Sequence, residues 1–291
     1  MKKSVRTLLA VLAVLVLLAL AAGAVLFVRH EKAQSARFAE LSQSIFRLQE
    51  ENARLAEVAG GEETARILQE LDSRVTRLET AAEYAAADYA YLAVGNSITM
   101  HPVNEVWPQA AGMAASSKEK DFVHLVASAL SQTEGKVALE AVYFYEWETG
   151  APDRAAKLTM LEPYLDPRLR LITLQLGENV TDQTTFEADF AELIRFLREK
   201  APEARILVID NFFPDPEMTE MKKAAAASAG VPFVSLAALQ GDPSLKAGTG
   251  APVYDEAGNS HAISHPDVAR HPGDEGMRRI AEAVLEAVKE K

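Results

Sequence analysis

The chain begins with a long, uninterrupted run of apolar residues. Residues 7–28, TLLAVLAVLVLLALAAGAVLFV, carry no charged side chain, and at about 1.5 Å of rise per residue a helix of this length spans roughly 30 Å of hydrocarbon. Lys2, Lys3 and Arg6 precede the run, whereas charges of both signs follow it, which favours a cytoplasmic N-terminus. The pattern predicts a single transmembrane anchor within residues 1–30 and an extracytoplasmic location for the rest of the chain.

A cleaved signal peptide is the alternative for this segment. Ala22-Gly23-Ala24 resembles a cleavage site, because small residues flank one intervening position. The apolar run continues to Val28, however, and is longer than the apolar core of an ordinary signal peptide. We therefore expect an anchor that stays attached to the chain.

A seven-residue repeat of apolar positions follows the anchor. One seam position holds Phe38, Ile45, Asn52 and Ala59, and the other holds Leu41, Leu48 and Leu55. This spacing is typical of a coiled coil, in which one buried asparagine favours two parallel strands. We expect a helical stalk over residues 31–85 that forms a homodimer. An amphipathic helix packed on the protein's own surface is the alternative that fits the same pattern.

From residue 86 onward, short β-rich runs alternate with amphipathic stretches. The predicted strands are 91–94, 137–145, 169–176, 205–210 and 232–236. The predicted helices are 119–132, 153–164, 184–200, 216–229 and 273–289. The alternation predicts an α/β domain over residues 86–291, with a parallel sheet covered by helices on both faces. Residues 240–270 show no clear periodicity, and a loop of that length is often functional.

Composition narrows the classes of partner and chemistry. The chain has 30 basic and 42 acidic residues, a net charge of −12, so it lacks the basic surface that nucleic acid requires. It contains no cysteine, which excludes disulfides, thiolate catalysis and thiolate metal ligands. Absence of free thiols also fits an exposed compartment.

The stretch GNSIT places Ser97 directly after the first predicted strand of the domain. A serine hydroxyl becomes a nucleophile only when a base accepts its proton, and His271, with Asp267 four residues upstream, is the best placed of six histidines. Asn179, at the end of another predicted strand, and the Ser97 backbone N–H could donate to an oxyanion. Taken singly, Ser97 could also be a helix-capping residue and Asn179 a turn residue.

Three motifs together resemble those of the SGNH/GDSL-type hydrolases. The family's G-D/N-S-x-[ST] block is similar to GNSIT, its G-x-N-D block is similar in part to GENV, and its D-x-x-H-P block is similar to DVARHP. The resemblance covers residues 91–277 and implies a flavodoxin-like three-layer α/β/α sandwich with a parallel sheet. It also implies that Ser97 is the nucleophile, that His271 is the base, and that the Ser97 N–H and Asn179 hold the oxyanion.

The chain departs from the family's pattern in three places. The glycine of the second block has no clear counterpart near YFYEWETG, where Trp147, Glu148 and Gly150 are the candidates. The third block ends in Val180 instead of aspartate. Asp267 lies one residue further from the histidine than usual, so either its carboxylate or a backbone carbonyl orients the base. Other residues expected to line the site are Glu148, Trp147 and His101.

Metal binding is a rival use of the same loop. His261, His265, Asp267 and His271 offer imidazole and carboxylate ligands that suit zinc. Such short spacings in a loop do not define a coordination geometry, and the predicted serine chemistry needs neither a metal nor a cofactor. We therefore expect no metal at this site.

The sequence thus predicts an extracytoplasmic, membrane-anchored serine esterase that works through an acyl-enzyme. Its location and the family resemblance favour removal of O-acetyl groups from a cell-envelope or extracellular carbohydrate. Hydrolysis of a lipid ester or thioester is the alternative within the same chemistry. A non-catalytic glycan-binding scaffold built on the same fold is the alternative from another class.

Overall fold

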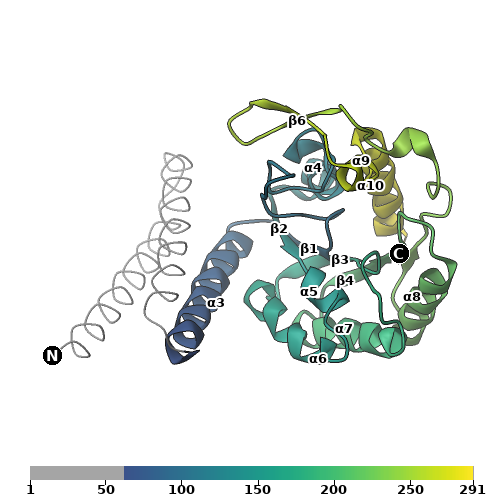
Figure 1. Ribbon diagram of the computed structural model, residues 1–291. Coiled ribbons are helices and arrows are strands. Elements are labelled where there is room, and N and C mark those ends of the chain that lie inside the picture. Colours follow the sequence, from purple (N-terminus) through teal and green to yellow (C-terminus); the bar gives the residue numbers. More distant parts are fainter. Residues whose placement is uncertain (1–61, 291) are drawn as a thin grey trace. The chain divides into compact units, whose positions relative to one another are not determined.

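The computed structural model describes residues 62–290, and the chain divides into two units between Ala86 and Ala87 (Figure 1). The predicted anchor and the greater part of the predicted stalk, residues 1–61, lie outside the described residues. Within residues 62–290, no helix has both the length and the apolar character that a membrane span needs.

The described part of the first unit is a single helix, α3, Glu62–Ala85. It covers the last part of the predicted stalk. Two of its large apolar side chains, Ile67 and Leu78, are exposed by 42% and 44%. Dimerisation of the stalk stays a prediction.

The second unit is built on a five-stranded sheet. Its strands are β1 Tyr89–Gly95, β2 Val137–Tyr143, β3 Leu169–Gln175, β4 Arg205–Ile209 and β5 Phe233–Val234. Their order is β2-β1-β3-β4-β5, and every neighbouring pair is parallel, which confirms the predicted parallel α/β architecture. All carboxyl ends therefore lie along one edge of the sheet, where sites form in folds of this kind.

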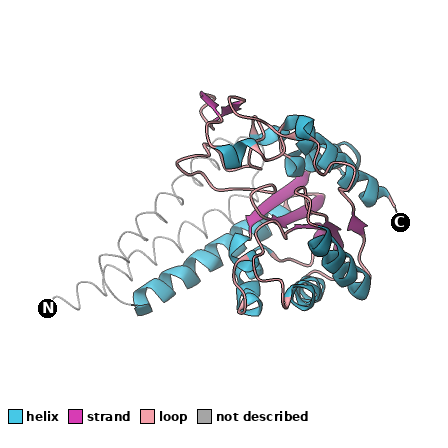
Figure 2. Ribbon diagram, turned by 45° about the vertical axis from the view of Figure 1, so that its right-hand side comes forward, coloured by secondary structure: helices cyan, strands magenta, loops and turns pink. Residues whose placement is uncertain are grey.

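Helices cover both faces of the sheet (Figure 2). One face carries α4 Phe122–Glu134 and α10 Asp274–Lys289. The other carries α6 Arg154–Lys157, α7 Phe186–Lys200 and α8 Pro216–Ala229, and the short helix α5 Tyr145–Glu148 follows β2. The predicted helix 153–164 is interrupted: after α6 the chain forms a 3-10 helix, Leu158–Tyr164, that contains Pro163. Two further 3-10 turns are Lys118–Lys120 and Pro243–Leu245.

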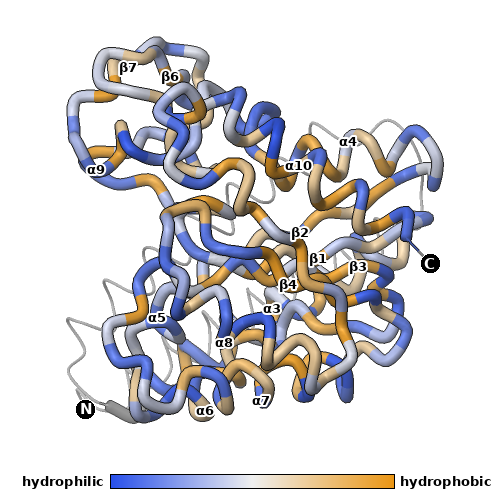
Figure 3. Tube along the Cα trace, turned by 90° about the vertical axis from the view of Figure 1, so that its right-hand side faces the viewer, coloured by the Kyte–Doolittle hydropathy of each residue, from blue (hydrophilic) through white to orange (hydrophobic). Residues whose placement is uncertain are grey.

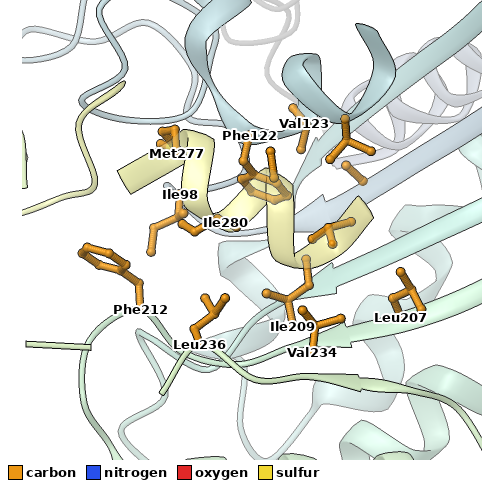
Figure 4. Packing of buried hydrophobic residues seen from close by; sticks show 14 of the residues in the cluster. Ile98, Phe122, Val123, Leu207, Ile209, Phe212, Val234, Leu236, Met277 and Ile280 are labelled. Carbon is orange, nitrogen blue, oxygen red and sulfur yellow. The ribbon is translucent and has the colours of Figure 1, made fainter. Parts of the chain in front are cut away.

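The strands are apolar because helices shield both of their faces. Six of the seven residues of β1 and six of the seven of β3 are buried, and the central strands form a hydrophobic band in Figure 3. Between the sheet and the helices α4 and α10, the core contains Phe122, Met277 and Ile280 (Figure 4). Ile98, from the turn after β1, lies in the same cluster beside Met277 and Ile280. The turn that carries Ser97 is therefore anchored in the core.

The predicted loop 240–270 contains structure that the periodicity does not reveal. Strands β6 Pro252–Tyr254 and β7 Ser260–Ala262 pair as an antiparallel hairpin, and α9 Pro266–Ala269 follows them. A second apolar cluster, which includes Trp107, Met113, Val253, Ile263 and Val268, lies beneath this segment. The cluster fixes the chain just before His271.

One buried carboxylate connects the start of α4 to the neighbouring loop. Asp121 is fully buried; its Oδ1 accepts the N–H of His124 at 2.8 Å and its Oδ2 accepts the N–H of Gly112 at 3.0 Å. A Cβ at Gly112 would lie 2.7 Å from the carbonyl oxygen of Ile98, so only glycine allows this close approach. Among the described residues, the side chain of Asp215, which caps α8, accepts the N–H of Met218, at 3.0 Å, and no other hydrogen bond.

We expect Asp121→Ala to lower the free energy of unfolding by about 2–4 kcal/mol, because it removes a helix cap worth about 1 kcal/mol and leaves the buried Gly112 N–H unpaired at about 1–3 kcal/mol. The matched variant Asp215→Ala loses only a cap and should cost about 1 kcal/mol. Urea unfolding followed by tryptophan fluorescence measures both, since both tryptophans lie in the second unit. Equal losses would show that neither the Gly112 contact nor the 2.7 Å contact between Asp121 Oδ1 and His124 Nδ1 contributes to stability.

Candidate active site

The residues of GNSIT form the tight turn that follows β1. A Cβ at Gly95 would lie 2.0 Å from Thr99 Oγ1 and 2.7 Å from the carbonyl oxygen of Gln175, so the position requires glycine. Asn96 Oδ1 accepts the N–H of Ile98 at 3.1 Å and closes the turn. Ser97 lies between Asn96 and Ile98, and it is half-buried at the carboxyl end of β1.

The fold brings Ser97 and His271 into contact across 174 residues of sequence. Ser97 Oγ lies 2.8 Å from His271 Nε2. His271 Nδ1 lies 2.6 Å from the backbone carbonyl oxygen of Asp267. Because a carbonyl oxygen can only accept, Nδ1 must carry the hydrogen, and Nε2 is left as the acceptor for the serine hydroxyl. This is the arrangement that a general base requires.

Asp267 therefore orients His271 through its backbone and not through its carboxylate. The Asp267 side chain is 70% exposed, and its carboxylate lies 3.5 Å from Arg270 Nε and 3.9 Å from His265 Nδ1. Helix α9 explains the geometry, since it turns the Asp267 carbonyl toward the residue four positions later. Of the two contacts that the sequence leaves open, the structure shows the one from the Asp267 backbone carbonyl.

Burial changes the pKa of His271. His271 is only 7% exposed, and desolvation lowers its pKa to about 4, with the Asp267 carbonyl acting in the opposite direction. Phe213 packs edge-on against the imidazole at 5.6 Å between ring centroids, and the Arg270 guanidinium lies 4.8 Å above the Phe213 ring. The imidazole is therefore neutral, and able to accept a proton, throughout the physiological pH range.

Each of the two expected oxyanion donors has a hydrogen that no described residue accepts. Among the described residues, no acceptor bonds the backbone N–H of Ser97. Asn179 Nδ2 donates to Glu148 Oε2 at 2.7 Å, and its second hydrogen has no acceptor in the described part of the chain. Glu148 also accepts from Asn96 Nδ2 at 3.1 Å, so this carboxylate joins the turn of the candidate nucleophile to the candidate oxyanion donor.

The three residues expected to line the site lie in different surroundings. Glu148 lies at the site, fully buried. Trp147 does not line it: the indole is fully buried against Phe186 and Phe190, each at 5.8 Å between ring centroids, and belongs to the core below the sheet. His101 is half-buried, its Nδ1 lies 2.7 Å from the Pro102 carbonyl oxygen, and burial lowers its pKa.

An aromatic shelf, formed by His101, Tyr143 and Tyr145, lies beside the turn. The rings of His101 and Tyr143 are 4.9 Å apart, and those of Tyr143 and Tyr145 stack at 5.7 Å with an angle of 6°. Desolvation raises the pKa of Tyr143 to about 12, whereas Tyr145 is 39% exposed. The sequence signal for this shelf is the spacing of two tyrosines at the end of a predicted strand, YFY.

The sequence also gives no sign of a charged cluster behind the site. Lys222 is fully buried and donates to Asn211 Oδ1 at 2.9 Å. Burial lowers the pKa of Lys222 to about 8, against the attraction of Glu178 and Asp210. Burial also raises the pKa of Glu178 to about 8, against the attraction of Lys222 and the Phe212 N–H that it accepts at 2.6 Å.

The four side chains of the rival metal site do not converge. His271 contacts Ser97, and His261 Nε2 lies 3.0 Å from Asp255 Oδ2 on the exposed hairpin. Within residues 62–290, no group of three or more histidine, aspartate or glutamate side chains has the arrangement of a metal site. The contact that the structure shows at Ser97 Oγ is the 2.8 Å one with His271 Nε2.

No family model and no curated protein matches the chain. Solved structures similar to it include a family two carbohydrate esterase from Clostridium thermocellum in complex with cellohexaose, at 17% sequence identity and TM-score 0.45, over 70% of this chain and 64% of that one. A two-domain esterase active on acetylated mannans, co-crystallised with mannopentaose, is similar at 16% identity and TM-score 0.47, over 74% of this chain and 55% of that one. An extracellular lipase from Streptomyces rimosus is similar at 16% identity and TM-score 0.41, over 68% of this chain and 99% of that one. The chain thus spans less than two thirds of the length of the first two of these proteins.

Proposed function

We propose that the chain is a serine esterase that works through an acyl-enzyme. The observation that carries this proposal is the 2.8 Å contact between Ser97 Oγ and His271 Nε2, with His271 Nδ1 held by a carbonyl oxygen. Ser97 Oγ attacks the acyl carbonyl carbon while its proton passes to Nε2. The imidazolium then gives that proton to the departing alkoxy oxygen, and the C–O bond of the ester breaks.

Water completes the cycle by the reverse route. His271 Nε2 accepts a proton from water, the hydroxide oxygen attacks the acyl carbon, and Ser97 leaves with the proton. In each half of the reaction the tetrahedral oxyanion is held by the Ser97 N–H and the free amide hydrogen of Asn179. These donors act on charge that exists only near the transition state, so they raise kcat in preference to lowering KM.

We infer an O-acetylated carbohydrate of the cell envelope or extracellular space as the substrate. The aromatic shelf supports this assignment. Tyr143 pairs with Gly95 at the start of the turn that carries Ser97, and Tyr145, which stacks on Tyr143 and is 39% exposed, offers flat apolar area to a sugar ring. The predicted N-terminal anchor supports an extracytoplasmic site of action. Acetyl is the acyl group that we propose.

The first experiment measures hydrolysis of 4-nitrophenyl acetate by the full chain. We expect turnover in the wild type and a loss of about 10³-fold or more in both Ser97→Ala and His271→Ala, because neither member of the pair functions without the other. The double variant should lose no more than either single variant. Multiplied losses in the double variant would contradict a shared role, and a wild type without turnover would contradict the esterase.

A second experiment separates the backbone of Asp267 from its carboxylate. We expect Asp267→Ala to keep kcat/KM within about two-fold of the wild type, because the exposed carboxylate is removed while the carbonyl remains. In both proteins kcat/KM should fall only as the pH drops toward about 4, where His271 takes up a proton and stops accepting one from Ser97. A large loss, or a wild-type acid limb near the ordinary histidine pKa of about 6.5 that moves to lower pH in Asp267→Ala, would assign the carboxylate a direct role.

A third experiment tests the shelf. We expect Tyr145→Ala to raise KM for an acetylated oligosaccharide by about 3–10-fold, as expected for an aromatic contact of about 1 kcal/mol, and to leave 4-nitrophenyl acetate hydrolysis within about two-fold. Tyr254→Ala on β6 is the matched control, since Tyr254 is exposed by 43% and Tyr145 by 39%. Equal effects on both substrates, or an equal effect of the control, would remove the shelf from substrate binding.

A further inference from the structure

Glu148 is a buried carboxylate for which the proposed chemistry has no step. It ends helix α5, has no exposed surface, and lies where the ends of β1, β2 and β3 meet. Its Oε1 accepts from Asn96 Nδ2 at 3.1 Å and from the backbone N–H of Gly177 at 2.5 Å, and its Oε2 accepts from Asn179 Nδ2 at 2.7 Å. Three donors thus bind one carboxylate, which offsets the cost of burying its charge.

A carboxylate whose two oxygens both accept hydrogen bonds fixes the direction of any amide that it contacts. An asparagine side chain has one donor end and one acceptor end of nearly equal size, whereas a carboxylate only accepts. Both Asn96 and Asn179 must therefore turn their nitrogen atoms toward Glu148. For Asn96 this leaves Oδ1 free to accept the N–H of Ile98 and to close the turn that carries Ser97.

For Asn179 the consequence is more direct. One hydrogen of its Nδ2 is committed to Glu148 Oε2, and the other is held in the amide plane at a fixed angle to the first. If the amide rotated by half a turn, the carbonyl oxygen would replace that nitrogen, and it would repel an oxyanion. The position of the useful hydrogen thus depends on an acceptor at Glu148.

The main chain around Glu148 is itself held rigidly. Arg154 is fully buried, and its guanidinium donates to the carbonyl oxygens of Trp147 at 3.2 Å, Glu148 at 3.2 Å and Asp182 at 2.7 Å. It therefore connects the end of α5 to the loop that follows Asn179. Buried Lys222 supplies a positive charge in the same region.

We propose that Glu148 is a positioning residue for the esterase reaction: it presents the free amide hydrogen of Asn179 to the oxyanion and keeps the Ser97 turn in register with it. This inference rests on the proposed function. It also supplies a role for the residue at the second-block position, where the chain has no glycine. Glu148 acts through Asn179 and Asn96 and does not touch the reacting atoms.

Glu148→Gln is the sharpest test, because it keeps the shape and removes one acceptor. A glutamine oxygen can serve Asn96 and Gly177, but its NH2 group then faces Asn179 Nδ2, and two donors cannot bond to each other. We expect kcat for 4-nitrophenyl acetate to fall by about 10–100-fold with KM changed by less than about three-fold, less than the roughly 10²–10³-fold expected for Asn179→Ala. The double variant should lose much less than the product of the two single losses.

Asp210→Asn is the matched control. Asp210 is also fully buried, and its carboxylate accepts from Thr219 Oγ1 at 2.7 Å and the Asn211 N–H at 2.9 Å, with no contact to Asn96 or Asn179. We expect this variant to keep kcat within about two-fold when it is folded. A Glu148→Gln enzyme with wild-type kcat, or losses that multiply in the double variant, would overturn the proposal.

A measurement that needs no turnover separates this proposal from the proposed function. With asparagine labelled by 15N in the full wild-type chain, and Asn179→Ala used for assignment, the two side-chain hydrogens of Asn179 should give widely separated signals that exchange slowly with water. One hydrogen is bonded to a carboxylate and the other is not. Two signals like those of a solvated amide would overturn the positioning role. This outcome depends neither on ester hydrolysis by the wild type nor on the folding of Glu148→Gln.

Discussion

A carboxylate without access to water joins the ends of three neighbouring strands, and the geometry of the site depends on it. Burying an isolated carboxylate is costly enough that it would normally bind a proton or find partners. Glu148 has three partners, one backbone N–H and two side-chain amides, all located at the carboxyl edge of the sheet. A parallel sheet brings these strand ends together whatever the loops contain. The buried charge then allows only one set of amide orientations there, because every partner must donate.

His271, the proposed base, is oriented differently from a histidine that contacts a carboxylate. A backbone carbonyl fixes the His271 tautomer and ring direction as well as a carboxylate would, but it offers only a dipole to the imidazolium of the proposed reaction. Burial disfavours the charged ring and outweighs the opposite effect of the Asp267 carbonyl, so the pKa of His271 is lowered to about 4. The result is a base that is neutral over a wide pH range and a weaker proton acceptor at any given pH. Preorganised donors for the oxyanion matter correspondingly more in such a site.

The sequence predicts the framework well because the framework is made by long, periodic segments. All five sheet strands and the helices α4, α7, α8 and α10 follow from runs of apolar or amphipathic residues. The hairpin β6–β7 and helix α9 do not, because three or four residues are too few for a period to show. Periodicity is a statistical signal, and it fades with length.

The candidate site is predictable to the extent that its chemistry is local. GNSIT and DVARHP reveal Ser97 and His271, whose roles depend on residue type and on strand-end placement. The sequence does not show whether the carboxylate or the backbone carbonyl of Asp267 contacts His271. The single turn of helix α9 determines that it is the carbonyl. Trp147 and Glu148 are neighbours in a four-residue helix, and only three-dimensional packing shows that one faces the core and the other faces the site.

Stability and the proposed chemistry are linked in this fold because the turn that carries Ser97, the proposed nucleophile, is part of the core. Ile98, the residue after Ser97, packs against α10, and the Ser97 carbonyl oxygen accepts the N–H of Met113 at 2.7 Å. Gly112, next to Met113, is held in turn by buried Asp121 at the start of α4. A shift of either helix would therefore move Ser97 relative to His271, and a misplacement of about 1 Å can cost about 10²-fold in rate. The close packing that makes this region costly to mutate is the same packing that keeps the serine and the imidazole within hydrogen-bond distance.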